Sequence, residues 1–412
     1  MPEDYLSGAS LYRDVVTYTE FGEHRTATEA DRRTTEWIAA ELEAAGLQVQ
    51  FHPFYLRQFF VHESSLTLGD TPIDCFPLWP PRHSGPQPIR APLVPFERGA
   101  DPGVTRNRIA LIKIMESDRT LRAARDEMIV AAADAGARAA VIIAGTPSGD
   151  LVGSVSADTS GRWPKIRPEP LPIPVVVVGS RDEKTLMAAV AQNAEAMLLV
   201  DGKTDPHAEA RNVLGRIDRG ENLIVVSTPF SGWFRCGGER GPGVALWLAL
   251  ARWAASHQSS TSYLFDCNSG HELFGLGMHA FMEEMAPPPA KVKCWAHLGA
   301  SIATWGWEQT PSGLRLYAQP ERYQLTTGTP EFLPVLTEAF AHLPGLKPFV
   351  GPGIGELLRF NADGYRAWGI FGVAGNPYFH APSDGPETTA PELLEPMALG
   401  LVRALEAIET TS

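Results

Sequence analysis

The sequence lacks the features that would mark export, membrane insertion or covalent cross-linking. It has only four cysteines in 412 residues, and none has the close spacing of a zinc knuckle or a redox motif. No apolar run reaches the roughly 20 residues that a membrane-spanning helix needs. The opening residues MPEDYLSGAS contain neither a basic stretch nor an apolar stretch, so no signal peptide is expected. These absences predict a soluble protein of the reducing cytoplasm.

Positive charge is also scarce. The chain carries 35 lysines and arginines against 48 aspartates and glutamates, a formal net charge of −13. Such a surface repels nucleic acids and anionic membranes, so neither is expected as a partner. The expected partner is a small-molecule or short-peptide substrate, and homo-oligomerisation is left open. With 44% hydrophobic residues, a chain of this length can bury a large core as two domains, or as one domain with an insertion.

Residues 57–205 differ from the rest of the chain in composition and in the length of their apolar runs. Proline and glycine punctuate short β-branched runs such as RIALIKIM, AAVIIAG and PVVVVGS, and a helix is expected over 121–137. Residues 146–172 have the composition of a long exposed loop. The pattern predicts a smaller α/β domain inserted at 57–205 into a larger domain formed by 1–56 and 206–412.

In the larger domain, segments expected to be strands alternate with segments expected to be helices. Strands are expected over 47–54, 222–230, 260–270 and 290–307, and helices over 27–46, 243–257, 271–285, 329–343 and 390–409. This alternation predicts a mixed, mostly parallel sheet sandwiched by helices. Ligands of such folds bind at the carboxyl ends of the strands. His271 and Glu272 directly follow one of these ends, so they mark the expected site.

The run HELFGLG does not match the helical zinc motif in which a second histidine follows at the fourth position. That position is Gly275, and the next histidine, His279, lies two helical turns or roughly 12 Å further along. The two titratable residues of the turn, His271 and Glu272, therefore need another explanation.

The order of motifs provides one. A strand, CGGERGPGVALWLALARW, a strand, GHELFGLG, a further strand and finally YFHAPSD together resemble the zinc aminopeptidase and glutaminyl cyclase family. FGEHRTATEADRRTTEWIAAELEAAGLQV resembles the amino-terminal helix of that family, and 57–205 resembles its protease-associated insert. The resemblance covers nearly the whole chain. It implies a zinc exopeptidase-like fold with an inserted protease-associated domain.

The family's metal-ligand positions are only partly retained. Where the family has its first histidine ligand this chain has Pro229, and where a later strand ends in an aspartate ligand it has Gly299. The resemblance implies that the remaining ligand positions are Glu239, Glu272 and His380. Two carboxylates and an imidazole would suit a single zinc ion, so at most one ion is expected.

His271 occupies the position of the family's general base, a glutamate. An imidazole exchanges protons near neutral pH, so His271 and Glu272 are the candidate catalytic residues. This favours a hydrolase of an amide or peptide bond with at most one metal ion. Two alternatives stay open: a metal-independent acid–base enzyme (lyase, isomerase, cyclase or transferase), or a non-catalytic ligand-binding pseudopeptidase in which His271 only fills space.

Several further residues are candidates for substrate binding. Glu356 takes the place of a pocket aspartate in the family segment, and Arg359 close by could clamp a substrate carboxylate. Arg235 and Arg240 flank Glu239, where they would neutralise it or bind an anion. Tyr378 is expected in a loop near the pocket, where it would contact a flat or apolar part of the substrate.

Overall fold

The computed structural model describes residues 4–115, 119–343, 345–372 and 376–411. The chain divides into two compact units. The first contains the residues up to Tyr55, Glu209–Phe379 and the residues from Asp384 on, and the second contains Leu56–Ala208 and His380–Ser383. The sequence placed the insert at 57–205 and assigned His380 to the larger domain, whereas the structure groups 380–383 with the second unit.

The first unit is built on a mixed sheet. Its strands, in spatial order, are β17 (Phe349–Val350), β16 (Tyr323–Thr327), β18 (Ala367–Gly372), β13 (Val292–Leu298), β11 (Leu223–Pro229), β12 (Ser262–Asn268) and the end of β10 (Glu195–Ile217). The central strands β18, β13, β11 and β12 run parallel, while β16 and β10 pair antiparallel on either side. The predicted fold class, a mostly parallel sheet between helices, is confirmed.

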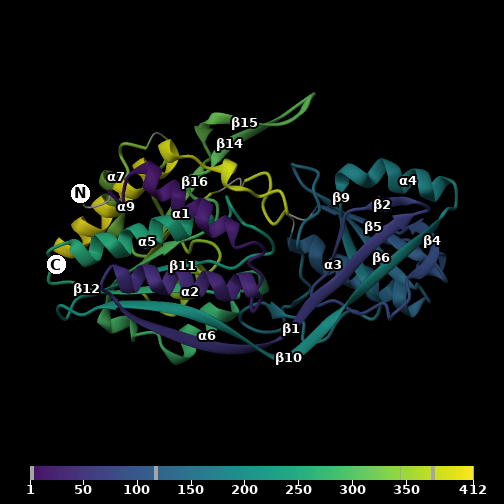
Figure 1. Ribbon diagram of the computed structural model, residues 1–412, viewed down its shortest axis with the longest axis horizontal. Helices are drawn as coiled ribbons and strands as arrows, with labels where there is room; N and C mark the ends of the chain where they lie inside the picture. The colour runs from purple at the N-terminus through teal and green to yellow at the C-terminus, as the bar shows by residue number, and fades with distance from the viewer. Residues whose placement is uncertain (1–3, 116–118, 344, 373–375, 412) are drawn as a thin grey trace. The chain divides into compact units, whose positions relative to one another are not determined.

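Helices cover both faces of this sheet (Figure 1). One face packs against α1 (Gly8–Glu20), α2 (Glu29–Ala44), α5 (Gly241–Ser256), α7 (Phe332–Ala339) and α9 (Pro391–Thr410). The other packs against α6 (Leu276–Glu284) and α8 (Leu357–Ala362). Successive strand residues point to opposite faces, so Ile224 and Val226 join the first cluster while Leu223 and Val225 join the second. Buried on both faces, these strands read as continuous apolar runs.

A polar row crosses the α6/α8 face near the carboxyl ends of the central strands. Ser227 of β11 lies opposite Asp266 of β12 on one side and His297 of β13 on the other. All three are buried, and they share a face with apolar residues two positions earlier on the strands, such as Val225 and Trp295. Polar groups in such surroundings need hydrogen-bond partners within the protein.

Two segments at the carboxyl ends differ from the prediction. The helix expected from His271 begins only at Leu276, because Gly270 (φ 81°), Phe274 (φ 64°) and Gly275 (φ 71°) adopt left-handed conformations around a short 3₁₀ turn, η3 (His271–Leu273). The strand expected over 290–307 ends at Leu298 as β13. Its last residues instead begin a hairpin of β14 (Trp305–Thr310) and β15 (Gly313–Pro320).

The second unit has its own sheet, whose strands in order are the start of β10, β4 (Ile89–Pro95), β5 (Ile109–Met115), β6 (Ala139–Gly145), β9 (Val175–Gly179) and β3 (Cys75–Pro77). Strands β4, β5, β6 and β9 run parallel, and the helices are α3 (Arg119–Asp134) and α4 (Glu183–Ala191). The division between the units falls inside two long strands, β10 and β1 (Gln48–Leu68), and β1 also pairs with β2 (Thr71–Ile73). Short 3₁₀ turns complete the elements: η1 (Pro102–Thr105), η2 (Ser180–Asp182), η4 (Pro289–Lys291) and η5 (Pro386–Thr388).

The segment 146–172 is more ordered than the exposed loop that its composition predicted. It contains a small antiparallel pair, β7 (Ala157–Asp158) and β8 (Lys165–Ile166). The fully buried Arg125 donates from Nη1 to Ser154 Oγ at 2.7 Å and from Nη2 to the carbonyl oxygen of Val155 at 3.0 Å. Polar composition alone did not reveal this buried anchor. In the part of the chain that the structure describes, no helix is both long and apolar enough to cross a membrane.

Candidate functional site

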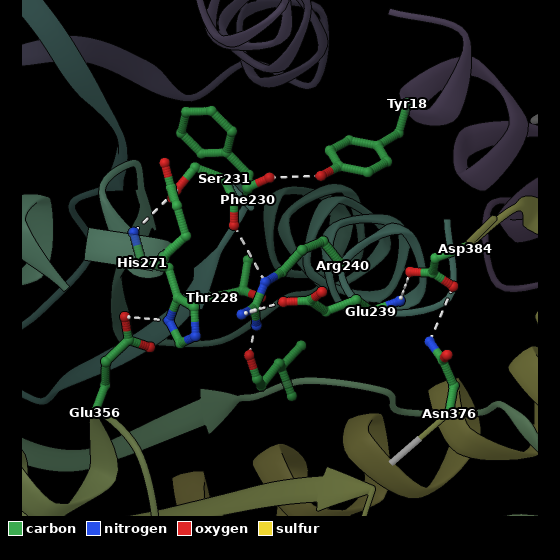
Figure 2. A network of polar contacts seen from close by, with 12 residues as sticks. Tyr18, Thr228, Phe230, Ser231, Glu239, Arg240, His271, Glu356, Asn376 and Asp384 are labelled. Atoms are coloured by element: carbon green, nitrogen blue, oxygen red, sulfur yellow. Dashed lines mark hydrogen bonds and ion pairs between the residues drawn. The ribbon is translucent and has the colours of Figure 1, made fainter. Parts of the chain in front are cut away.

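A buried carboxylate lies between two imidazole rings at the carboxyl end of the first unit's sheet. His271 Nδ1 is 3.1 Å from Glu356 Oε1, and His297 Nε2 is 3.1 Å from Glu356 Oε2 (Figure 2 shows the first contact). The first contact has hydrogen-bond geometry, while the second is close but less well aligned. Glu356 and His297 are 5% and 1% exposed at their side chains, whereas His271 is 24% exposed. The chain of contacts therefore runs from the core to the surface and ends at His271.

Glu356 is held in its ionised form. Burial alone would raise the pKa of this carboxyl, but the charges and hydrogen bonds of His271 and His297 outweigh burial and hold the pKa well below its usual value. Glu356 immediately precedes α8, and His271 lies in the turn after β12. The fold thus places a fixed negative charge beside the half-buried imidazole of His271.

Glu272 is fully engaged with the protein. Its Oε1 accepts from the backbone N–H of Thr26 at 2.8 Å and from Thr26 Oγ1 at 2.6 Å, and its Oε2 accepts from Ser231 Oγ at 2.8 Å. Ser231 Oγ in turn accepts from the backbone N–H of His271 at 2.9 Å. Glu272 therefore ties the segment before α2 to the loop after β11, and it fixes the backbone from which His271 projects.

Glu239 forms a buried ion pair with its neighbour. Arg240 Nη2 is 2.9 Å from Glu239 Oε1, and both side chains are 1% exposed. Arg240 Nε also donates to the carbonyl oxygen of Ser231 at 3.2 Å (Figure 2). Of the two flanking arginines, Arg240 is thus the one that pairs with Glu239. The negative charge of Glu239 is balanced by this side chain of the protein.

The turn that carries Glu239 is fixed by Asp384. This aspartate accepts from the backbone N–H groups of Gly238 at 3.0 Å and Glu239 at 2.9 Å, and from Asn376 Nδ2 at 2.9 Å. Burial, together with the nearby charge of Glu239, raises the pKa of Asp384 to about 8. Sequence reasoning gave Asp384 no role, although it closes the YFHAPSD motif.

An aromatic ring fills the space of the missing carboxylate at position 299. A Cβ atom on Gly299 would lie 2.0 and 2.2 Å from Cδ1 and Cε1 of Phe371, a buried residue of β18. No side chain fits there unless the ring moves. In this structure, Gly299 and the ring of Phe371 therefore leave no space for a side-chain ligand at position 299.

These contacts do not fit the single zinc site that the resemblance implied. Among the described residues, no group of three or more His, Cys, Asp and Glu side chains is placed to hold a metal ion. Glu239 is neutralised by Arg240, and both oxygens of Glu272 accept hydrogen bonds. His380 belongs to the second unit, where its carbonyl oxygen accepts from the backbone N–H of Gly153 at 2.9 Å. The carboxylates of Glu239 and Glu272 are therefore already used within the protein and do not fit the implied ion.

The other residues predicted from the sequence lie in different surroundings. Arg235 is exposed, and Tyr378 is half-buried, with its backbone N–H donating to Asn376 Oδ1 at 2.7 Å. Arg359 contacts His279 Nδ1 at 2.6 Å and also forms an ion pair with Asp363. The guanidinium of Arg359 is thus already engaged within the protein.

Two cysteines lie near these residues, and both are buried. Cys236 is in the loop before α5, and Cys267 is on β12. Burial raises the pKa of both thiols well above the usual value, and nearby carboxylates raise it further. Neither is a good thiolate nucleophile near neutral pH.

The sequence did not predict the polar row of Ser227, Asp266 and His297. Trp295 Nε1 donates to Ser227 Oγ at 2.7 Å, and Ser227 Oγ is 3.0 Å from His297 Nδ1. Asp266 Oδ2 accepts from Asn268 Nδ2 at 2.9 Å, while Asp266 Oδ1 has no hydrogen-bond partner among the described residues. The available signal was a polar residue near the end of each of three apolar strands.

Burial raises the pKa of Asp266 to about 8, and the charge of Glu356 contributes in the same direction. An unfolded aspartate titrates near 3.9, so between about pH 4 and pH 8 the folded chain keeps a proton that the unfolded chain releases. The stability contributed by Asp266 is therefore complete below about pH 4 and declines by about 1.4 kcal/mol per pH unit up to about pH 8.

We expect Asp266→Asn to raise the melting temperature relative to wild type at pH 8, and by much less at pH 5. Scanning calorimetry at the two pH values measures this difference. Asp218→Asn, at a half-exposed position, is the control and should show no such pH-dependent gain. An equal effect of Asp266→Asn at both pH values would contradict the buried, protonated state.

Solved structures with the same fold are zinc aminopeptidases and related peptidases. A zinc aminopeptidase from Bacillus subtilis aligns with a TM-score of 0.74 at 18% identity, over 98% of this chain and 95% of its own. A peptidase precursor from Shewanella amazonensis aligns with a TM-score of 0.76 at 16% identity, over 98% and 93%. An aminopeptidase from Aneurinibacillus gives 0.66 at 16% identity, over 97% and 93%.

These similarities establish the fold over nearly the entire chain. The protein has the zinc aminopeptidase fold, as the order of its motifs predicted. No family model and no curated protein sequence matches the chain.

Proposed function

We propose that the protein is an enzyme that cleaves an amide or peptide bond in a small molecule or short peptide, with His271 as general base and no metal ion at Glu239 and Glu272. The observation that carries the proposal is the contact of His271 Nδ1 with the buried, ionised Glu356. The aminopeptidase activity of proteins with this fold supports the choice of amide chemistry.

The geometry suits proton transfer at the half-buried ring of His271. If Nδ1–H donates to Glu356, the lone pair of Nε2 is free to accept a proton. In hydrolysis, the oxygen of a water molecule would bond to the carbonyl carbon while its proton passes to Nε2. The carbon–nitrogen bond would then break as Nε2 returns that proton to the leaving nitrogen. Glu356 would stabilise the positive imidazolium between the two steps.

The neighbouring residues would have supporting roles. Glu272 would act through Ser231, which holds the backbone N–H of His271, and so would position the base rather than take up the proton. Arg240 would supply the positive charge that Glu239 requires. Arg235, which is exposed, and Tyr378, which is half-buried, remain the candidate substrate contacts.

The test follows a mixture of short peptides and acyl amides by mass spectrometry, with protein purified without added metal and assayed with a chelator. Wild type should convert some members with gain of water, and His271→Ala should reduce the rate by about 10²–10⁴-fold. His207→Ala, at an exposed histidine of the second unit, is the matched control and should keep the wild-type rate.

Three results would contradict the proposal. If no peptide or amide is converted, the assigned reaction class is wrong. If the purified protein contains one zinc ion per chain and loses its activity on chelation, the metal-independent mechanism is wrong. Conversion with loss of ammonia instead of gain of water would indicate cyclisation and would also contradict hydrolysis.

A further inference from the structure

The hydrogen bonds of the polar row have a direction that is set at the indole of Trp295. An indole N–H can only donate, so Trp295 Nε1, 2.7 Å from Ser227 Oγ, uses one lone pair of that oxygen. The hydroxyl proton of Ser227 then needs an acceptor, because the residue is completely buried. His297 Nδ1 lies 3.0 Å from the oxygen and can take that role. The proton of Ser227 therefore points to His297.

This direction assigns the tautomer of His297. If Nδ1 accepts from Ser227, the proton of the neutral ring is on Nε2, the atom that lies 3.1 Å from Glu356 Oε2. The opposite tautomer would place a lone pair against the carboxylate and leave the Ser227 hydroxyl without an acceptor. Each such loss is unfavourable in a buried site, because the unpaired group has no water to replace its partner.

The same donor and acceptor argument applies to the contact between Glu356 and His271. With Oε2 facing the Nε2–H of His297, Oε1 faces His271 Nδ1 at 3.1 Å. A carboxylate can only accept, so it selects the His271 tautomer whose proton is on Nδ1. The residues on the chain of contacts come from β11, β13 and the segment before α8, all within the first unit.

We propose that Ser227 and His297 are positioning residues that act through Glu356 to fix the tautomer of His271, with its proton on Nδ1 and the lone pair of Nε2 directed away from the carboxylate. The inference deepens the proposed function and rests on it for its catalytic meaning. The tautomer itself is a property of the resting protein and requires no substrate.

The test reads that tautomer directly. Protein labelled with ¹⁵N at its histidine rings is examined by long-range ¹H–¹⁵N correlation at mildly alkaline pH, and the signals of His271 are assigned by their absence in His271→Gln. Wild type should show one protonated nitrogen, Nδ1, and one unprotonated nitrogen, Nε2. His297→Phe should move both shifts towards those of a mixture of tautomers, because Glu356 loses the donor that orients it. Ser227→Ala should do the same, because His297 Nδ1 loses the donor that keeps the ring proton on Nε2.

Two further variants separate positioning from mere packing. His297→Gln should restore the wild-type pattern, because an amide N–H can replace Nε2–H as donor to Glu356. His52→Phe alters another buried histidine of the first unit, one that contacts Asn212 and Glu284 instead of this row, and should leave the His271 signals unchanged. If His297→Phe does not fold, the smaller change Ser227→Ala provides the same readout.

The tautomer of His271 in the wild type and in the variants decides whether the inference holds. A wild-type His271 with its proton on Nε2 would overturn the inference, as would folded Ser227→Ala and His297→Phe proteins with unchanged His271 signals. The predicted tautomer and its loss in these variants, found in a protein that converts no amide, would support the positioning and contradict only the proposed function.

Discussion

Replacing Arg240 with methionine is expected to lower the free energy of unfolding by about 3–5 kcal/mol. The substitution leaves the carboxylate of Glu239, 1% exposed and 2.9 Å from the guanidinium, as an unpaired charge in the protein interior. It also removes the hydrogen bond from Arg240 Nε to the carbonyl oxygen of Ser231. Urea denaturation of the purified variant measures the loss.

A double variant identifies the cause. In Glu239→Gln/Arg240→Met no charge is left unpaired, so much of the stability should return. Arg32→Met is the control, because Arg32 forms exposed ion pairs on α2 with Glu29 and Glu36, and such pairs contribute about 0–1 kcal/mol. An Arg240→Met protein as stable as the Arg32→Met protein would contradict the assigned role of the buried pair.

Introducing at position 299 the aspartate that the resemblance implied is expected to destabilise the protein by about 3 kcal/mol or more. The new Cβ would overlap the ring of Phe371, whose nearest atoms lie 2.0 and 2.2 Å from the ideal Cβ position. The added carboxylate would also be placed beside an aromatic ring in a buried site. Thermal and urea denaturation of Gly299→Asp measure the effect.

The ring can be removed to test this explanation. Phe371→Ala alone should lose about 3–5 kcal/mol because it leaves a cavity. Adding Gly299→Asp to that background should be less harmful than adding it to wild type, since the space is then open. Gly161→Asp, at an exposed glycine with an ordinary 3.5 Å contact, controls for the substitution itself. Strict additivity of the two changes would refute the overlap.

Both expected results concern positions where the resemblance implied metal ligands. In one, a guanidinium supplies the positive charge beside Glu239. In the other, an aromatic ring occupies the volume that a carboxylate at position 299 would need. The sequence showed that Pro229 and Gly299 cannot provide side-chain ligands, but it did not show that the remaining carboxylates are already occupied by Arg240, Thr26 and Ser231.

The sheet was predictable because its strands are buried on both faces. The apolar runs around Ile224 and Phe265 follow from that burial, and the amphipathic helices between them follow from covering it. The helix expected from His271 was wrong in its start, because an apolar pattern does not reveal that Phe274 adopts a left-handed conformation. Nor does the local sequence pattern reveal that the fully buried Arg125 donates hydrogen bonds to Ser154 and Val155 in the segment 146–172.

Single residues of the candidate site were predictable from the sequence, but the contacts between them were not. His271 stood out because it follows a strand end, and Glu356 because it occupies a family position. Their contact joins residues 85 positions apart, and no periodicity specifies such a pairing. The sequence assigned Ser227 no role and favoured a core position over a site position for His297, and only the strand register placed the two residues opposite each other.

The sequence by itself determined the layered α/β fold, because hydrophobic periodicity is a local property that survives in the linear order of residues. It also predicted a site at the carboxyl ends of the strands. Only the tertiary structure decided which charges meet. Whether a buried carboxylate binds an ion, an arginine or a histidine depends on distances of about 3 Å between groups far apart in the chain, and strand register and helix packing set those distances.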